Sequence, residues 1–385
     1  MAFVAFVAFV VGLDIMTLHI GLVGGGGITE SHARAARDVP GLEIAAVQGS
    51  NREKVEAICA RHGGRPYADF EAFLAHRPLD LVAIGSPSGL HALQGIAAAK
   101  AGLHVLVEKP IDITTAGADA LVAEARAAGV AVGVFFQDRL KPDVCRMKGA
   151  IDSGAIGRPI LADARVPWYR PPEYYGASRW RGTWALDGGG ALMNQGIHTV
   201  DLLVWLLGDV ARVHARTATL LHEIEVEDSG AAILEFASGA LGVLSFTTAA
   251  YPGYPRRVSV TGDAGSIVLE QDAVVAWDLR EPGSFPPALD GSADSRQHAA
   301  GSRQQITRDP LQAASRPLPA VPVITAASSP VVTDVAPHRA VIEDFLQAIR
   351  EGRPPRCDGR DGRRSVAIVE AIYRSSRSGH AERVG

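Results

Sequence analysis

Three side chains in this sequence could together carry out chemistry: Lys109, Asn194 and His198. Lys109 follows the apolar run 105–107, which predicts a buried strand, and open parallel sheets bind ligands just beyond the carboxyl ends of their strands. Asn194 and His198 are four residues apart, so a helix would place them on one face. A histidine suits the removal of a hydroxyl proton near neutral pH. With Lys109 to hold the oxygen, these residues predict oxidation of an alcohol carbon.

Each of these residues also has an ordinary structural interpretation. Lys109 could be a solvated lysine at a strand end, and His198 could be a histidine packed on a helix. The functional interpretation depends on the surroundings. The triple glycine 188–190 interrupts the chain just before the expected helix 191–207, and an aromatic, arginine-rich loop precedes it.

A glycine-rich turn after the first expected strand predicts a dinucleotide site. Gly24, Gly26 and Gly27 would let the backbone approach a pyrophosphate, which would rest on the N-terminus of a helix that begins near Ile28. The third position of the motif is Thr29 rather than Gly or Ala, which implies looser packing between helix and strand. A glycine-rich turn without a ligand is the alternative.

The end of the second expected strand, 42–47, bears on the choice between NAD and NADP. An acidic residue there would bind the ribose hydroxyl of NAD, and none is present. Ser50, Asn51 and Arg52 occupy this position and could bind a 2′-phosphate, so the sequence slightly favours NADP. Ser50 and Asn51 could equally cap the helix 52–62.

Other residues that follow later strands are expected to complete the cofactor site. They are Ser86, Pro87, His91, Glu108, Lys109 and Gln137. Strands alternate with helices of ten to fifteen residues up to this point, which is typical of an α/β doubly wound parallel sheet. Beyond it, several strands with little helix between them predict an α+β domain with an antiparallel sheet.

Composition is that of a globular enzyme. A chain of 385 residues predicts two domains, and a net charge of -4 without a long basic run argues against a nucleic-acid partner. The three cysteines lie far apart, so they predict neither a metal site nor a disulfide framework, and they indicate a reduced, cytoplasmic setting.

Four segments follow from these patterns. Residues 1–15 are expected to be an apolar extension outside the fold, too short to span a bilayer, with a weak membrane or partner anchor as the alternative. Residues 16–137 would bind the dinucleotide. Residues 138–385 would form the second domain, with a partly disordered insertion around 282–332 that is rich in Pro, Ser, Ala, Gln and Gly.

The loop before the triple glycine combines arginines with aromatic rings. Arginines there could meet a phosphate or carboxylate, and aromatic rings could stack on a sugar or base. Packing of these rings between subunits is an equally good interpretation. The residues expected near the substrate are Tyr169, Arg170, Arg179, Arg181, Trp184 and, on the following helix, Asp201.

These features together resemble the glucose–fructose oxidoreductase and inositol dehydrogenase family. The resemblance extends over nearly the whole chain from Met16, and the motifs that carry it are Gly24-x-Gly26, Ser86-Pro-Ser, Glu108-Lys-Pro, the stretch 188–201 and Pro337-His-Arg. It implies a Rossmann domain and an open-faced C-terminal sheet, which commonly forms a homodimer or homotetramer interface in the family. It also implies NAD- or NADP-dependent oxidation or reduction of sugars, inositols, glycosides or sugar nucleotides. The family's catalytic lysine and histidine match Lys109 and His198.

One departure from the family pattern concerns Asn194. Sugar and inositol dehydrogenases of the family often carry Asp at this position, and an amide cannot take a proton. Proton transfer would then depend on His198, or on Lys109 if burial lowers its pKa. A similar Asn occurs in members that resemble sugar-nucleotide 3-dehydrogenases, which favours a UDP-sugar or a glycoside oxidised at C3. Two alternatives remain: redox-neutral glycoside cleavage through a bound NAD, and a non-catalytic dinucleotide sensor.

Overall fold

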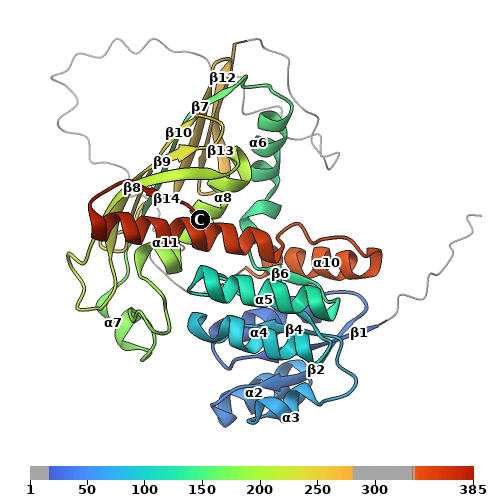
Figure 1. The fold of residues 1–385 in the computed structure, drawn as a ribbon. Helices are drawn as coiled ribbons and strands as arrows, with labels where there is room; N and C mark the ends of the chain where they lie inside the picture. Colours follow the sequence, from blue (N-terminus) through green and yellow to red (C-terminus); the bar gives the residue numbers. More distant parts are fainter. Residues whose placement is uncertain (1–16, 281–331, 333) are drawn as a thin grey trace, which may run out of the picture.

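The computed structural model describes residues 17–280, 332 and 334–385, which build two domains around two sheets (Figure 1). The expected extension 1–15 lies outside the described residues, as does the expected insertion 282–332 except for Val332. The first sheet has six parallel strands in the order β3-β2-β1-β4-β5-β6. Its strands are β1 (Leu18–Val23), β2 (Leu42–Gln48), β3 (Arg65–Tyr67), β4 (Leu81–Ile84), β5 (His104–Val107) and β6 (Val132–Val134).

Helices cover both faces of this sheet, as the predicted doubly wound fold requires. They are α1 (Gly27–Arg37), α2 (Arg52–His62), α3 (Phe70–Leu74), η1 (Ser88–Leu90), α4 (His91–Lys100) and α5 (Thr115–Ala128). Asn51 caps α2 by accepting from the backbone N–H of Lys54, and Gly129 ends α5 in a left-handed conformation. Between β2 and β4 lie β3 and α3, which are only three and five residues long and too short to show a periodic pattern in the sequence.

The second sheet has eight strands in the order β13-β12-β11-β7-β10-β9-β8-β14, and every pair except β7–β10 is antiparallel. Along β8 and β9 buried and exposed residues largely alternate, so one face is covered and the other is open. The predicted fold class is confirmed. The strands are β7 (Pro159–Pro167), β8 (Val210–Ala218), β9 (Ser229–Phe236), β10 (Leu241–Thr247), β11 (Arg257–Gly262), β12 (Gly265–Glu270), β13 (Ala273–Leu279) and β14 (Glu382–Arg383).

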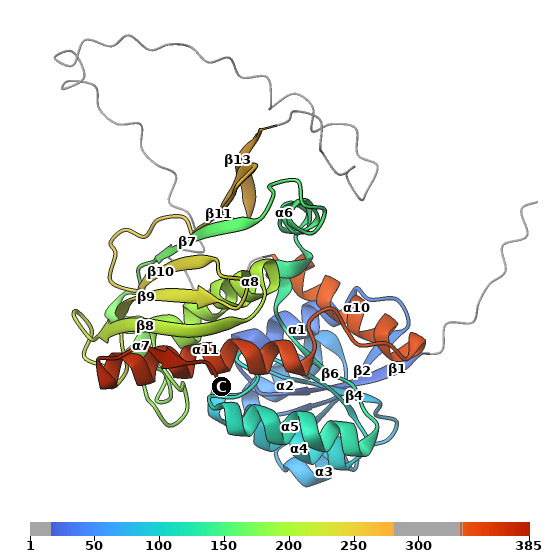
Figure 2. The ribbon, with the colours of Figure 1, turned by 45° about the horizontal axis from the view of Figure 1, so that its top comes forward.

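The remaining helices follow the first sheet along the chain. They are η2 (Gln137–Leu140), α6 (Pro142–Asp152), α7 (Pro172–Gly176), η3 (Ala191–Gly196), α8 (Ile197–Leu207), α10 (Ala336–Glu351) and α11 (Gly359–Ser378). Figure 2 shows α11 running alongside β8, and the two make extensive contacts. Among the described residues no helix is long and apolar enough to cross a membrane.

Helix α10 returns to the first domain, although it comes late in the chain. It packs on α1 (Figure 2), and its residues Val341, Ile342, Phe345 and Leu346 are buried in the same apolar cluster as strand β1. A domain boundary at residue 137 does not anticipate this return. The last part of the chain therefore helps to build the dinucleotide-binding half.

The helix expected over 191–207 is not regular. It begins with the π-helical turn η3 and becomes α-helical only at Ile197. A π-helical turn is wider than an α-helical one and often lies at a functional site. Asn194 lies in the wide turn and His198 in the α-helix that follows it, so the four-residue spacing between them spans two kinds of helical turn.

Candidate active site

Lys109 joins the two domains at the predicted position. It follows β5, and its Nζ donates to the backbone oxygen of Asn194 at 2.7 Å. Burial lowers the pKa of Lys109 from its ordinary value, while Glu108 and Asp187 oppose this effect. The sequence predicts that Lys109 and Asn194 lie in one site, and in the structure the two are in direct contact.

His198 lies in α8 with 13% of its side chain exposed. Its Nδ1 is 3.9 Å from Asp138 Oδ2. The Nδ1 atom has no hydrogen-bond partner among the described residues. Burial lowers the pKa of His198 to about 3, although the carboxylate of Asp138 opposes the shift and the charge of Lys109 adds to it. The imidazole is therefore neutral near pH 7.

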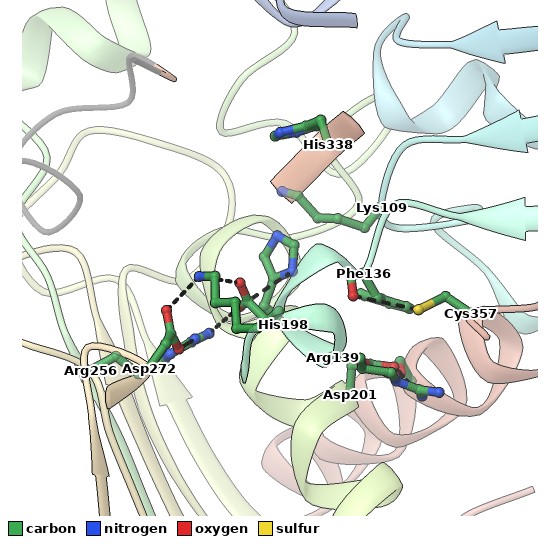
Figure 3. A network of polar contacts seen from close by, with 12 residues as sticks. Lys109, Phe136, Arg139, His198, Asp201, Arg256, Asp272, His338 and Cys357 are labelled. Atoms are coloured by element: carbon green, nitrogen blue, oxygen red, sulfur yellow. Dashed lines mark hydrogen bonds and ion pairs between the residues drawn. The ribbon is translucent and has the colours of Figure 1, made fainter. Parts of the chain in front are cut away.

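A buried ionic network holds Asp138 beside His198. Arg256 Nη1 and Lys141 Nζ each lie 2.7 Å from one oxygen of Asp138, and both cations also pair with Asp272 (Figure 3). Sequence reasoning missed this network. The position of Asp138 immediately after Gln137, at the end of the last parallel strand, was the one available signal.

The glycine-rich turn has the shape that a dinucleotide requires. Gly24 has φ +122°, and a Cβ there would lie 2.6 Å from Thr29 Oγ1 and 2.8 Å from Gly85 O. A Cβ at Gly26 or Gly27 would meet nothing within 4 Å, so the turn faces open space. Gly26 precedes α1 without a side-chain cap, which leaves the first amides of the helix for an anion.

The neighbouring residues at the end of β2 are exposed. Ser50, Asn51 and Arg52 are all exposed, and Asn51 caps α2 as the alternative interpretation expected. Arg52 Nε pairs with Glu56 Oε1 at 2.7 Å. The Arg52 guanidinium is therefore exposed at the surface, but the negative charge of Glu56 partly neutralises it.

Two of the expected cofactor residues turn inward. Both ring nitrogens of His91 lie against backbone oxygens, Nδ1 at 2.7 Å from Pro110 O and Nε2 at 2.9 Å from Ser86 O. His91 therefore braces two loops and offers neither ring nitrogen to a cofactor, which corrects the prediction. Its neighbours in the prediction, Ser86 and Pro87, are partly exposed in the loop that His91 braces.

Glu108 is likewise an interior residue. Its Oε1 lies 3.0 Å from His32 Nε2 and 3.8 Å from His338 Nε2 of α10. Burial raises the pKa of Glu108, but the two histidines outweigh this effect and lower it to about 2. Glu108 therefore anchors α10 beside Lys109, and its carboxylate is directed at these two histidines. Gln137 is different, because its buried Oε1 has no hydrogen-bond partner in the described part of the chain.

The arginine and aromatic loop gathers beside Lys109. Arg170 is 4% exposed and lies over the rings of Trp168 and Tyr174, and Arg181 lies 4.5 Å above the Tyr174 ring. Both guanidinium groups are close enough to Lys109 to help lower its pKa. Tyr169, by contrast, packs edge to face on Tyr251, and Arg179 is exposed.

Trp184 and Asp201 have partners outside this cluster. Trp184 packs edge to face on Tyr373 and borders a separate hollow with Arg374 and Arg377. Asp201 is 1% exposed, and its two oxygens accept from Arg139 Nε and Nη2 at 2.8 and 2.6 Å (Figure 3). The Asp201 carboxylate is therefore paired with Arg139 in the interior of the domain.

Glu227 was missed, although it holds the triple-glycine turn. It accepts from the backbone N–H groups of Gly190 and Leu192 at 3.0 and 2.9 Å and from the Tyr373 hydroxyl at 2.9 Å. A Cβ at Gly190 would lie 1.9 Å from Glu227 O, so only glycine fits there. Burial raises the pKa of Glu227 from 4.5 to about 7, outweighing these hydrogen bonds.

This raised pKa predicts a pH-dependent stability. The folded state holds the Glu227 proton more tightly, so this contribution is complete below about pH 4.5 and is lost as the pH rises through 7. We expect the stability of wild type relative to Glu227→Gln to fall by about 3 kcal/mol across this window. Thermal unfolding from pH 4 to 8 measures it, with the exposed Glu53→Gln as the control. A difference that does not change with pH would contradict the prediction.

Two family models match the chain. The one described as an oxidoreductase family with an NAD-binding Rossmann fold matches residues 18–136, and the one described as the GFO/IDH/MocA C-terminal domain matches residues 144–268. The chain belongs to the Gfo/Idh/MocA oxidoreductase family. It is an enzyme that transfers hydride between a nicotinamide dinucleotide and the hydroxyl or ketone carbon of a sugar-like substrate.

Curated relatives extend over most of the chain. D-apiose dehydrogenase of Paraburkholderia graminis is 28% identical over 363 residues, which is 93% of this chain and 87% of the relative. Inositol 2-dehydrogenase 2 of Saccharopolyspora erythraea is 30% identical over 269 residues, 68% of this chain and 75% of the relative. The WlbA dehydrogenase from Bordetella pertussis, solved with NADH and UDP-GlcNAcA, has a TM-score of 0.80 at 32% identity and covers 96% of this chain and 98% of its own.

Proposed function

We propose that this Gfo/Idh/MocA enzyme oxidises a secondary hydroxyl of an anionic sugar or sugar nucleotide. The observation that carries the proposal is the 2.7 Å contact from Lys109 Nζ to the backbone oxygen of Asn194. It brings the lysine of the cofactor domain to the helical segment that carries His198.

The chain's own residues divide the work as follows. A nicotinamide dinucleotide, when bound, would supply the hydride acceptor. His198, neutral because of its burial, accepts the hydroxyl proton as general base. Lys109 donates a hydrogen bond to the substrate oxygen as it becomes a carbonyl, and Asn194 positions the hydroxyl. The open glycine turn at Gly26 and Gly27 would hold the pyrophosphate.

The charge around Lys109 supports an anionic substrate. Lys109, Arg170 and Arg181 lie within electrostatic reach of one another, and no described carboxylate forms an ion pair with Arg181. Burial raises the pKa of Asp187 only to about 6, so this carboxylate is mostly ionised near neutral pH, and together with Glu108 it offsets two of the three positive charges. A carboxylate or phosphate on the substrate would balance the site. The UDP-GlcNAcA in the WlbA complex and Asn194 both favour a sugar nucleotide, with C3 as the reacting carbon.

For the cofactor, NAD is favoured by the NADH bound in related structures. We propose that NADP is also accepted, since no acid follows β2 and Arg52 is exposed there. The ion pair of Arg52 with Glu56 weakens this preference. A cytoplasmic location is supported by the three free cysteines.

A second copy of the chain is the proposed occupant of the open face of the second sheet. Leu161, Ile233, Leu241 and Val243 are 40–50% exposed on three adjacent strands, and strand register places them side by side. Light scattering of the purified protein should give a dimer or tetramer. A monomer would contradict this assignment.

The test of the function is reduced-nicotinamide absorbance with a panel of sugars, uronates, inositols, glycosides and UDP-sugars, run with NAD and NADP in parallel. We expect turnover with anionic members, abolished by His198→Ala. Turnover restricted to neutral sugars would overturn the anionic substrate. Silence across the panel with cofactor binding intact would overturn the sugar substrate.

A further inference from the structure

Asp187 lies immediately before the triple glycine and is 2% exposed. Its Oδ1 accepts from Asn194 Nδ2 at 2.6 Å, and its Oδ2 accepts from the backbone N–H of Gly182 at 2.9 Å. Within the described ranges it forms no ion pair with a lysine or arginine. The carboxylate is therefore buried and held by two hydrogen bonds.

Asn194 is fixed at both ends by these contacts. Its backbone oxygen accepts from Lys109 Nζ, and its side-chain NH₂ donates to Asp187. An ionised carboxylate can only accept hydrogen bonds, so it selects one of the two orientations of the Asn194 amide. In that orientation the amide oxygen makes no hydrogen bond to any described residue and is left as an acceptor.

We propose that Asp187 is a positioning residue that keeps the Asn194 amide oxygen turned toward the reacting hydroxyl. This inference rests on the proposed function, because the hydroxyl is that of the sugar. With Asp187 ionised, the Asn194 oxygen and the His198 ring share the single substrate O–H hydrogen in a three-centre hydrogen bond, which ends when the proton passes to His198. Loss of the carboxylate would let the amide rotate and present its NH₂ group instead.

The pH range in which this works follows from the surroundings of Asp187. Burial raises its pKa to about 6, opposed by the hydrogen bonds of Gly182 and Asn194 and by the charges of Lys109 and Arg181. Three phenols also lie within electrostatic reach: Tyr174, Tyr175 and Tyr373. A protonated Asp187 can donate to the amide oxygen, so oxidation should rise with pH through about 6.

An exchange of the two side chains separates positioning from mere structure. In Asp187→Asn, the single remaining oxygen accepts from Gly182 and the new NH₂ faces Asn194, which must rotate. We expect kcat to fall about 100-fold, with the affinity for NADH unchanged and the rise near pH 6 lost. Combining Asp187→Asn with Asn194→Asp restores one donor facing one carboxylate, and at least a tenfold part of the loss should return.

Controls and contrary outcomes are as follows. Asp152→Asn, on the exposed end of α6, should behave as wild type. Circular dichroism and NADH fluorescence establish that each variant is folded. An active wild type whose Asp187→Asn variant keeps its rate and pH profile, or a double variant worse than both single ones, would overturn the inference alone.

A measurement without substrate judges the inference if the wild type is silent in the panel. Selective ¹⁵N labelling lets the side-chain NH₂ signal of Asn194 be followed by NMR, with Asn194→Ala to assign it. We expect that signal to titrate near pH 6 in wild type and to lose this titration in Asp187→Asn. A wild-type signal that does not change with pH would overturn the inference whatever the substrate is.

Discussion

Replacing Lys109 with alanine is expected to lower kcat about 1,000-fold while the cofactor still binds. In the proposed mechanism Lys109 is the cation placed where charge develops on the substrate oxygen, and loss of such a donor costs about 100- to 1,000-fold in rate. The contact to the Asn194 backbone oxygen is lost as well, so the helix of His198 is no longer tied to β5. Steady-state kinetics with the substrate found in the panel would measure the effect, with NADH affinity followed by fluorescence.

Lys100→Ala is the matched control, because this side chain is 64% exposed at the end of α4. It should leave kcat within about twofold of wild type, as surface substitutions have small effects. Unchanged turnover in Lys109→Ala with cofactor binding intact would show that another group polarises the oxygen.

Replacing Asp201 with alanine is expected to destabilise the fold by about 3–5 kcal/mol, because it removes one partner of a buried ion pair. Arg139 is 3% exposed, donates twice to Asp201, and would keep only its contact with Asp361 Oδ2 at 2.7 Å as an ion pair. Arg139 connects η2 to α8 and α11, so the loss of its ion pair with Asp201 would weaken the packing of all three elements. Urea unfolding would measure the change.

Asp163→Ala provides the comparison, since Asp163 pairs with Arg165 on the surface at 3.1 Å. Its removal should cost less than about 1 kcal/mol. A loss below about 1 kcal/mol in Asp201→Ala would mean that Arg139 finds a new partner or water. Asp201 would then be free for the substrate role that the sequence suggested.

Much of the fold could be predicted because its signals are local. The glycine turn at Gly24, the apolar run before Lys109 and the cap at Asn51 each depend on neighbouring residues. Three- and five-residue elements such as β3 and α3 carry no period to detect. The residues of the π-helical turn that contains Asn194 are of types that also occur in α-helices, so the sequence could not predict its wider geometry.

The sequence could predict which types of residue follow the strand ends, but not the direction in which each side chain points. Lys109 and the Asn194 segment do meet, but His91 and Glu108 follow strand ends with the same chemistry and turn inward instead. Which way a polar side chain points depends on partners far along the chain, such as His338 for Glu108. Asp187 and Asp138 could not be predicted for the same reason. Asp187 bonds to Asn194, and Asp138 bonds to Arg256 far along the chain.

The return of α10 to the first domain bears on the order of events during synthesis. The six parallel strands are complete once residue 134 has been made, yet the helix that covers α1 begins only at residue 336. Until then the surface that receives Phe345 and Leu346 has no cover, and Glu108 lacks the imidazole of His338. A nascent chain therefore carries a nearly finished nucleotide fold with an apolar flank open to chaperones or to other nascent chains.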